Sequence, residues 1–165
     1  MKSILVANQK GGTGKSTIAD NLAWSLERTG IPYNFYDLDN QGGVIHQTKE
    51  VDGATVSVID TPGALQSDMR RWMDAADCIV IPTRMTMMDM KPLQRMMEIV
   101  SKVDCPVVYV LNGANRYRAA AGFEEWFREA AGAATALKLP QSEAIAQAAA
   151  YGVSVVEYAP RSPAA

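Results

Sequence analysis

Several residue types that mark particular protein classes are scarce in this sequence. Its 165 residues include two cysteines, Cys78 and Cys105, and one histidine, His46. The close cysteine pairs that metal or iron–sulfur ligation needs are absent, so we expect both thiols to be buried. A single histidine in a polar loop is more often solvent-exposed than a ligand, and we expect this of His46.

The sequence also lacks an excess of charge of one sign. Lysine and arginine number 16 against 18 acidic residues, which gives a net charge of −2. No global field draws the protein to nucleic acid, so DNA binding would need a local basic patch. No apolar run is long enough to span a bilayer. The apolar strand begins at residue 2 and leaves no room for a signal peptide, so we expect a cytoplasmic protein without a membrane partner.

A glycine-rich segment, residues 9–17, reads Gln-Lys-Gly-Gly-Thr-Gly-Lys-Ser-Thr and lies between an apolar run and a helical pattern. This is the strand, loop and helix context of a phosphate-binding loop. Glycines let backbone N–H groups close around phosphate oxygens, and the helix N-terminus favours the anion. Lys15 would reach the β and γ phosphates, and Ser16 would bind Mg²⁺. The alternative is an ordinary glycine-rich turn, which this spacing disfavours.

Apolar runs alternate with helical patterns along most of the chain, which predicts an α/β fold with a mostly parallel sheet and helices on both faces. With 48% apolar residues, the chain can bury the core of one domain, which we place at 1–159, followed by a flexible tail at 160–165. The predicted strands are 2–8, 31–38, 56–59, 78–81, 106–111 and 134–137. The predicted helices are 16–29, 65–75, 89–102, 123–131 and 142–151, with an extended segment at 153–158.

Carboxylates follow two of the predicted strands. Asp37 and Asp39 end the second strand, and Asp60 follows the third. Ligands gather at the carboxyl ends of strands in an open α/β sheet, so these residues are candidates for organising Mg²⁺ and water. The alternative is turn chemistry, because Asp, Pro and Gly are common where strands end.

The loop carries a second lysine, Lys10, and the run Lys-Gly-Gly-Thr-Gly-Lys-Ser-Thr resembles the deviant Walker A motif of the ParA/MinD family of ATPases. The resemblance implies an ATP-sandwich homodimer in which Lys10 touches the partner's nucleotide. Residues 37–42 resemble the family's switch I, which implies that Asp39 positions the attacking water and Asp37 supports the metal. The segment that begins Asp60-Thr-Pro resembles switch II, which implies that Asp60 holds Mg²⁺ through water.

The resemblance also implies a full set of nucleotide contacts. Asn112 would read the adenine edge, although an Asn-Gly turn is its alternative, and a proline loop at Pro140 would pack beside the base. Thr17 would contact the α-phosphate side. The expected nucleotide-binding residues are therefore Gly11, Gly12, Thr13, Gly14, Lys15, Ser16, Thr17, Asn112 and Pro140.

The functional expectation is a ParA-like ATPase that partitions DNA or positions cargo, using ATP and Mg²⁺. The resemblance implies a nucleoid-associated dimer, a ParB-like adaptor, and non-specific DNA binding through Arg84, Arg116, Arg118 and Arg161. Alternatives are a MinD-like or conjugation-associated dimer switch, or a metabolic ATP-using enzyme on the same fold. An iron–sulfur carrier would want paired cysteines. The six methionines between residues 85 and 97 are either core filler or a partner surface.

Overall fold

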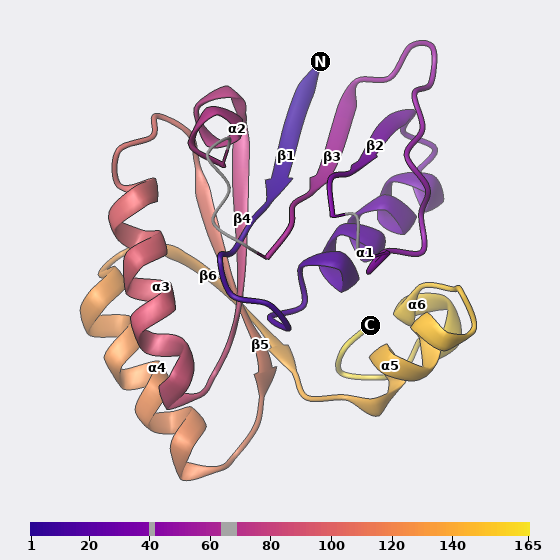
Figure 1. Cartoon of the computed structure of the whole chain (residues 1–165). Helices are drawn as coiled ribbons and strands as arrows, with labels where there is room; N and C mark the ends of the chain where they lie inside the picture. The colour runs from indigo at the N-terminus through magenta and orange to yellow at the C-terminus, as the bar shows by residue number, and fades with distance from the viewer. Residues whose placement is uncertain (40–41, 64–68) are drawn as a thin grey trace.

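A six-stranded sheet forms the centre of the molecule (Figure 1). The computed structural model describes residues 1–39, 42–63 and 69–165. Every strand pair is parallel, and the strand order is β2-β3-β1-β4-β5-β6. The strands are β1 (Lys2–Val6), β2 (Tyr33–Asp37), β3 (Val56–Asp60), β4 (Cys78–Arg84), β5 (Val107–Ala114) and β6 (Thr135–Pro140).

Helices cover both faces of the sheet, as the sequence predicts (Figure 1). They are α1 (Lys15–Arg28), α2 (Met69–Ala75), α3 (Met87–Val100), α4 (Arg118–Ala131), α5 (Glu143–Ala150) and α6 (Val155–Tyr158). α1 buries Ala19 and Ala23 against one face. The other face packs against α2, α3 and α4, where Leu93 and Phe123 are fully buried. In the described ranges, no helix combines the length and apolar character that crossing a membrane requires.

The position of β1 decides where a ligand can bind. β1 pairs with β3 on one side and with β4 on the other, so it lies near the middle of the sheet. All strands are parallel, so their carboxyl ends lie along one edge. The loop that leaves β1 therefore emerges at the centre of that edge, where open α/β sheets bind ligands.

Helix α3 begins two residues earlier than predicted. Starting the helix near Asp89 places Pro92 in its first turn, but α3 begins at Met87 and Pro92 lies inside it. The helix tolerates the lost backbone hydrogen bond because α3 buries Leu93 and Met96. Helix α4 begins at Arg118, five residues before the predicted start at 123. The first described residue of α2 is Met69, and the predicted start at 65 lies outside the described residues.

The C-terminal part of the chain corrects two expectations. Residues 155–158 form the short helix α6 rather than an extended segment, with the Ser154 side chain accepting a hydrogen bond from the Glu157 N–H at 3.1 Å. The predicted tail is not free, because Ala164 is buried against Ala148 and Val155. Small side chains allow this close packing of a segment whose composition argued against it.

The methionine cluster divides into two groups. Met85 and Met96 are buried, and Met90 and Met97 pack against the same core. Met87 and Met88 are 65% and 82% exposed in the first turn of α3. Four of the side chains are therefore core residues, and a partner surface remains an interpretation for the exposed pair alone.

Candidate nucleotide-binding site

The loop between β1 and α1 has the backbone conformation that a phosphate-binding loop requires. Gly12 and Gly14 have φ angles of +72° and +99°, which side-chain-bearing residues rarely adopt. A Cβ atom at Gly14 would lie 2.3 Å from Asn112 Nδ2. Gly14 is the N-cap of α1, so the first N–H groups of the helix face the loop. Backbone geometry and packing thus both require glycine here.

Lys15 is the first residue of α1 and is only 6% exposed. Burial lowers the pKa of its ammonium, and the nearby carboxylates of Asp60 and Asp39 act in the opposite direction. Its Nζ lies 3.3 Å from the position that a Cβ atom would take at Gly63. The cation is therefore held inside the site, beside the carboxyl ends of β2 and β3.

Asp60 ends β3 and is fully buried. Neither of its carboxylate oxygens has a hydrogen-bond partner among the described residues. Burial raises the pKa of Asp60 to about 6, and outweighs the opposing effects of Ser16 and Lys15. A buried carboxylate without partners is costly, and a cation bound next to it would remove the cost. The donor set therefore fits Mg²⁺, which prefers oxygen ligands.

Ser16 lies close to the loop that follows β2. A Cβ atom at Gly43 would come within 2.7 Å of Ser16 Oγ, so only glycine leaves this hydroxyl its space. No group of three or more His, Cys, Asp or Glu side chains within 1–39, 42–63 and 69–165 could hold a metal alone. A Mg²⁺ ion here would thus rely on Ser16, Asp60, water and phosphate oxygens.

The two switch I carboxylates lie beside Asp60. Asp37 is the register partner of Asp60 in the β2–β3 pair. Its Oδ1 accepts a hydrogen bond from the Asp39 N–H at 2.9 Å, and its own N–H donates to Thr48 Oγ1 at 3.0 Å. Asp37 and Asp39 both raise the pKa of Asp60 through their charge. The predicted metal and water residues are therefore neighbours, although Asn40 and Gln41 of the same segment lie outside the described residues.

The side chain of Lys10 pairs with a residue of α3. Its Nζ lies 2.5 Å from Oδ1 of Asp89, a residue of α3 that is 1% exposed. Its N–H donates to Asn8 Oδ1 at 3.0 Å, and Asn8 Nδ2 donates to the carbonyl of Pro82 at 2.7 Å. The sequence predicts a helix start at Asp89, but no contact of Asp89 with the phosphate-binding loop and no role for Asn8. The spacing Thr86-x-x-Asp89 is a helix N-terminal signal, which places Asp89 at the start of α3 and does not predict its pairing with Lys10.

The predicted adenine-side residues also lie at this edge. Asn112 Nδ2 donates to the carbonyl of Thr13 at 3.0 Å, so β5 holds the phosphate-binding loop directly. Pro140 ends β6 and is the register partner of Ala114. Asn112 thus contacts the phosphate-binding loop and Pro140 lies at the same edge of the sheet, and their contacts with a base remain predictions.

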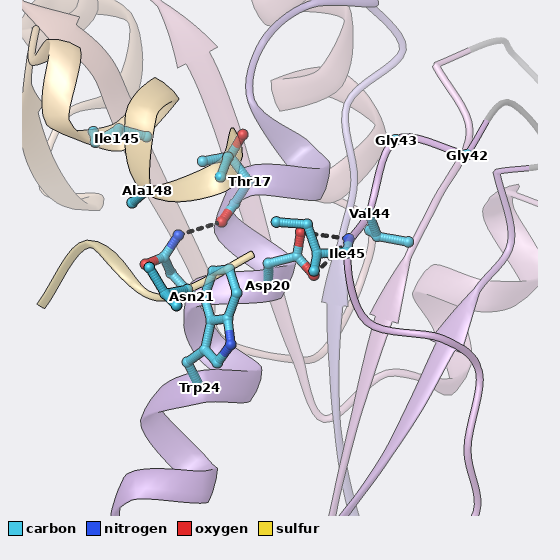
Figure 2. Close-up of a pocket in the computed structure, with 12 residues that line it drawn as sticks. Thr17, Asp20, Asn21, Trp24, Gly42, Gly43, Val44, Ile45, Ile145 and Ala148 are labelled. Atoms are coloured by element: carbon cyan, nitrogen blue, oxygen red, sulfur yellow. Dashed lines mark hydrogen bonds between the residues drawn. The ribbon is translucent and has the colours of Figure 1, made fainter. Parts of the chain in front are cut away.

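A pocket of about 260 Å³ lies between α1, residues 42–45 and α5 (Figure 2). On its floor the carboxylate of Asp20 accepts hydrogen bonds from the Ile45 N–H at 2.9 and 3.1 Å. Asp20 also accepts from the His46 N–H at 3.0 Å, and His46 Nδ1 lies 2.7 Å from its Oδ1. The loop after switch I is therefore fastened to α1.

The prediction that His46 is exposed is wrong. Its side chain is 10% exposed, and its ring packs against Trp24 and Phe35 at centroid distances of 5.0 and 5.3 Å. Asp20, one turn into α1, supplies the polar partner that lets the ring be buried. Asp20 and His46 are 26 positions apart in the sequence, so no local pattern predicts their contact. The two cysteines are half-buried rather than buried.

Comparison with known families agrees with this geometry. Residues 4–155 match the CobQ/CobB/MinD/ParA nucleotide binding domain family. The chain belongs to this family. The resemblance seen in the glycine-rich loop is confirmed, and so is the α/β fold.

Two curated relatives match part of the chain. Protein ParA of Rhizobium radiobacter is 28% identical over 115 residues, which cover 54% of this chain and 51% of the relative. The chromosome-partitioning ATPase Soj of Thermus thermophilus is 32% identical over 103 residues, which cover 42% of this chain and 41% of the relative. The chain thus matches about half the length of these curated relatives or less.

Solved structures of similar fold include nucleotide complexes. An aspartate-to-alanine variant of McdA from Cyanothece with ATP has a TM-score of 0.79 at 17% identity, covering 96% of this chain and 90% of the other. MinD from Pyrococcus horikoshii OT3 with Mg-ADP has a TM-score of 0.76 at 17% identity, covering 98% and 90%. At such identities the likeness establishes the fold.

Proposed function

We propose that the chain binds Mg·ATP at the carboxyl edge of the sheet and hydrolyses it within a dimer of two ATP-loaded copies. The observation that carries this proposal is that the two lysines of the loop have different surroundings. Lys15 is buried in the site beside Asp60. Lys10, in the same loop, has its ammonium outside that site, next to α3. A second lysine in this position is suited to contact the nucleotide bound by a partner copy rather than the nucleotide bound by its own copy.

The residues of the chain divide the chemistry as follows. The backbone of residues 11–16 and the Lys15 ammonium hold the phosphates. Ser16 and Asp60 would hold Mg²⁺, which neutralises phosphate charge when bound. Asp39 orients the water, and Lys10 of one copy stabilises the charge that develops on the other copy's γ-phosphoryl group. Loss of the γ-phosphate then relaxes the switch segments and opens the dimer.

The cellular role we propose is that of a ParA-type ATPase in DNA partition or cargo positioning. One of the two relatives found by sequence, Soj, is a chromosome-partitioning ATPase by name, and the other is named ParA. The ATP-loaded dimer would bind nucleoid DNA without sequence preference and would respond to a ParB-like adaptor. Such binding should weaken steeply as salt is raised, because it depends on contacts between cations and phosphates.

The most direct test of the two-lysine division is Lys10→Ala. We expect ATP binding, followed with a fluorescent ATP analogue, to stay near the wild-type affinity because Lys15 is intact. Hydrolysis, followed by phosphate release, should fall to background, since a cation supplied in trans contributes about 10³–10⁵-fold to phosphoryl transfer. Lys2→Ala, at the opposite edge of the sheet, is the matched control. A Lys10→Ala protein that hydrolyses ATP at the wild-type rate would contradict the proposal.

A further inference from the structure

The ion pair between Lys10 and Asp89 joins two segments 79 residues apart in the chain. Lys10 lies in the phosphate-binding loop, and Asp89 lies in the first turn of α3. The Nζ–Oδ1 distance is 2.5 Å, and the side chains are 32% and 2% exposed. The Asp89 carboxylate is therefore almost completely buried, while the Lys10 side chain remains partly exposed to solvent.

Two further groups fix this arrangement. The Thr86 hydroxyl donates to the second carboxylate oxygen of Asp89, so both oxygens are engaged. The Lys10 N–H donates to Asn8 Oδ1, and Asn8 Nδ2 donates in turn to the Pro82 carbonyl. The backbone of Lys10 is therefore tied to the same strand end from which α3 departs, and its side chain is directed to its own subunit.

We propose that Asp89 is a positioning residue that holds Lys10 within its own subunit in the nucleotide-free monomer. It opposes dimer formation until the Lys10–Asp89 ion pair breaks. This inference rests on the proposed function, in which Lys10 acts on a second copy. Asp89 fixes the Lys10 ammonium against α3 of its own subunit, so reaching a partner's phosphate requires Lys10 to leave this carboxylate. Closing the dimer thus includes the exchange of Asp89 for phosphate oxygens.

The carboxylate can tolerate this exchange. Asp89 is the third residue of α3, where the helix N-terminus favours a negative charge. It keeps the hydrogen bond from Thr86 when Lys10 leaves. Losing one hydrogen bond between charged groups corresponds to about a tenfold change in an equilibrium constant. Two such pairs open when one dimer closes, so we expect Asp89 to weaken ATP-dependent dimerisation by about a hundredfold, tenfold for each copy.

The first arm of the test measures the ion pair without relying on dimerisation. Lysine acylation by an N-hydroxysuccinimide ester of acetate, read by peptide mass spectrometry, reports how available the Lys10 amine is in the nucleotide-free protein. Asp89→Asn should raise the rate at Lys10 by about tenfold. Thr86→Val, which keeps the carboxylate but removes its hydroxyl partner, should raise it by less. Asp77→Asn breaks the exposed Lys2–Asp77 pair and should leave Lys10 unchanged.

The second arm measures dimer affinity with Mg·ATP by sedimentation. Asp89→Asn should tighten the dimer by about a hundredfold, tenfold for each copy, while leaving ATP affinity unchanged, which a merely structural role would not do. If Asp89→Asn does not fold, Thr86→Val carries both arms with smaller shifts in the same direction. Equal acylation of Lys10 in wild type and variants overturns the inference, and so does faster acylation without a tighter dimer. If no protein dimerises with ATP, wild type included, the proposed function fails, and the release step fails with it. The acylation rates then still decide whether Asp89 holds Lys10.

Discussion

The environment of Asp60 suits a bound cation and lowers the stability of the protein without nucleotide. Its side chain is fully buried, and its oxygens accept no hydrogen bond from the described residues. Burial raises the pKa of Asp60, and so do the charges of Asp37 and Asp39, whereas Ser16 and Lys15 lower it. The carboxylate thus destabilises the nucleotide-free protein, and a Mg²⁺ ion bound with nucleotide would relieve that cost.

Asp60→Asn should therefore stabilise the nucleotide-free protein in a pH-dependent way. The folded-state pKa of Asp60 is about 6 against an ordinary value of 3.8, so the folded protein binds this proton more tightly than the unfolded chain does. The penalty for the charged carboxylate appears as the pH rises from about 4 to 6 and is complete above 6. Urea unfolding should show a gain of about 2–3 kcal/mol at pH 7.5 and little gain at pH 4.

Asp60→Asn should also weaken Mg²⁺-dependent nucleotide binding, while binding without Mg²⁺ changes little. A gain in stability that is the same at both pH values would show that Asp60 is not a strained carboxylate.

At the scale of elements, the attachment of residues 42–46 to α1 links switch I to the helix that starts at the phosphate-binding loop. Asp20 accepts from two backbone N–H groups and from the His46 ring. His46 is in turn packed on Trp24. A loop that is rich in glycine is therefore held in one place by a buried carboxylate.

Asp20→Ala should destabilise the protein by about 3 kcal/mol, because several hydrogen bonds to a charged group are lost and partly buried N–H groups lose their acceptor. Amide hydrogen exchange at Ile45 and His46 should become faster. The control is Asp74→Ala, which removes an exposed ion pair with Arg70 and should change stability by no more than about 0.5 kcal/mol. Equal effects of the two substitutions in urea unfolding would contradict the attachment.

The strands, the helices and the phosphate-binding loop differ in how well the sequence predicts them. The strands and the phosphate-binding loop follow from local signals, because apolar runs, glycines and the lysine-serine pair lie next to one another in the chain. The contacts of Asp89 with Lys10, and of His46 with Asp20, join distant segments and left no local pattern. The predicted start of α3 is wrong because it relies on Pro92, whose lost backbone hydrogen bond is outweighed by the buried apolar face of the helix.

For the whole molecule, the parallel strand order is what assembles the site. β1 lies between β3 and β4, so its loop meets Asp60 on one side and the start of α3 on the other. The proposed nucleotide residues thus lie at one edge, and the Lys10 side chain is partly exposed beside Asp89. This arrangement leads us to expect a nucleotide-controlled dimer rather than a permanent one.

The most direct measurement of that expectation is molar mass by light scattering in four conditions: no nucleotide, ADP, ATP with Mg²⁺, and ATP without Mg²⁺. We predict a monomer in every condition except Mg·ATP, where a dimer should form. Asp39→Ala should trap this dimer by blocking hydrolysis, and Lys10→Ala should abolish it. A monomer in all four conditions, or a dimer that does not depend on ATP, would contradict the account.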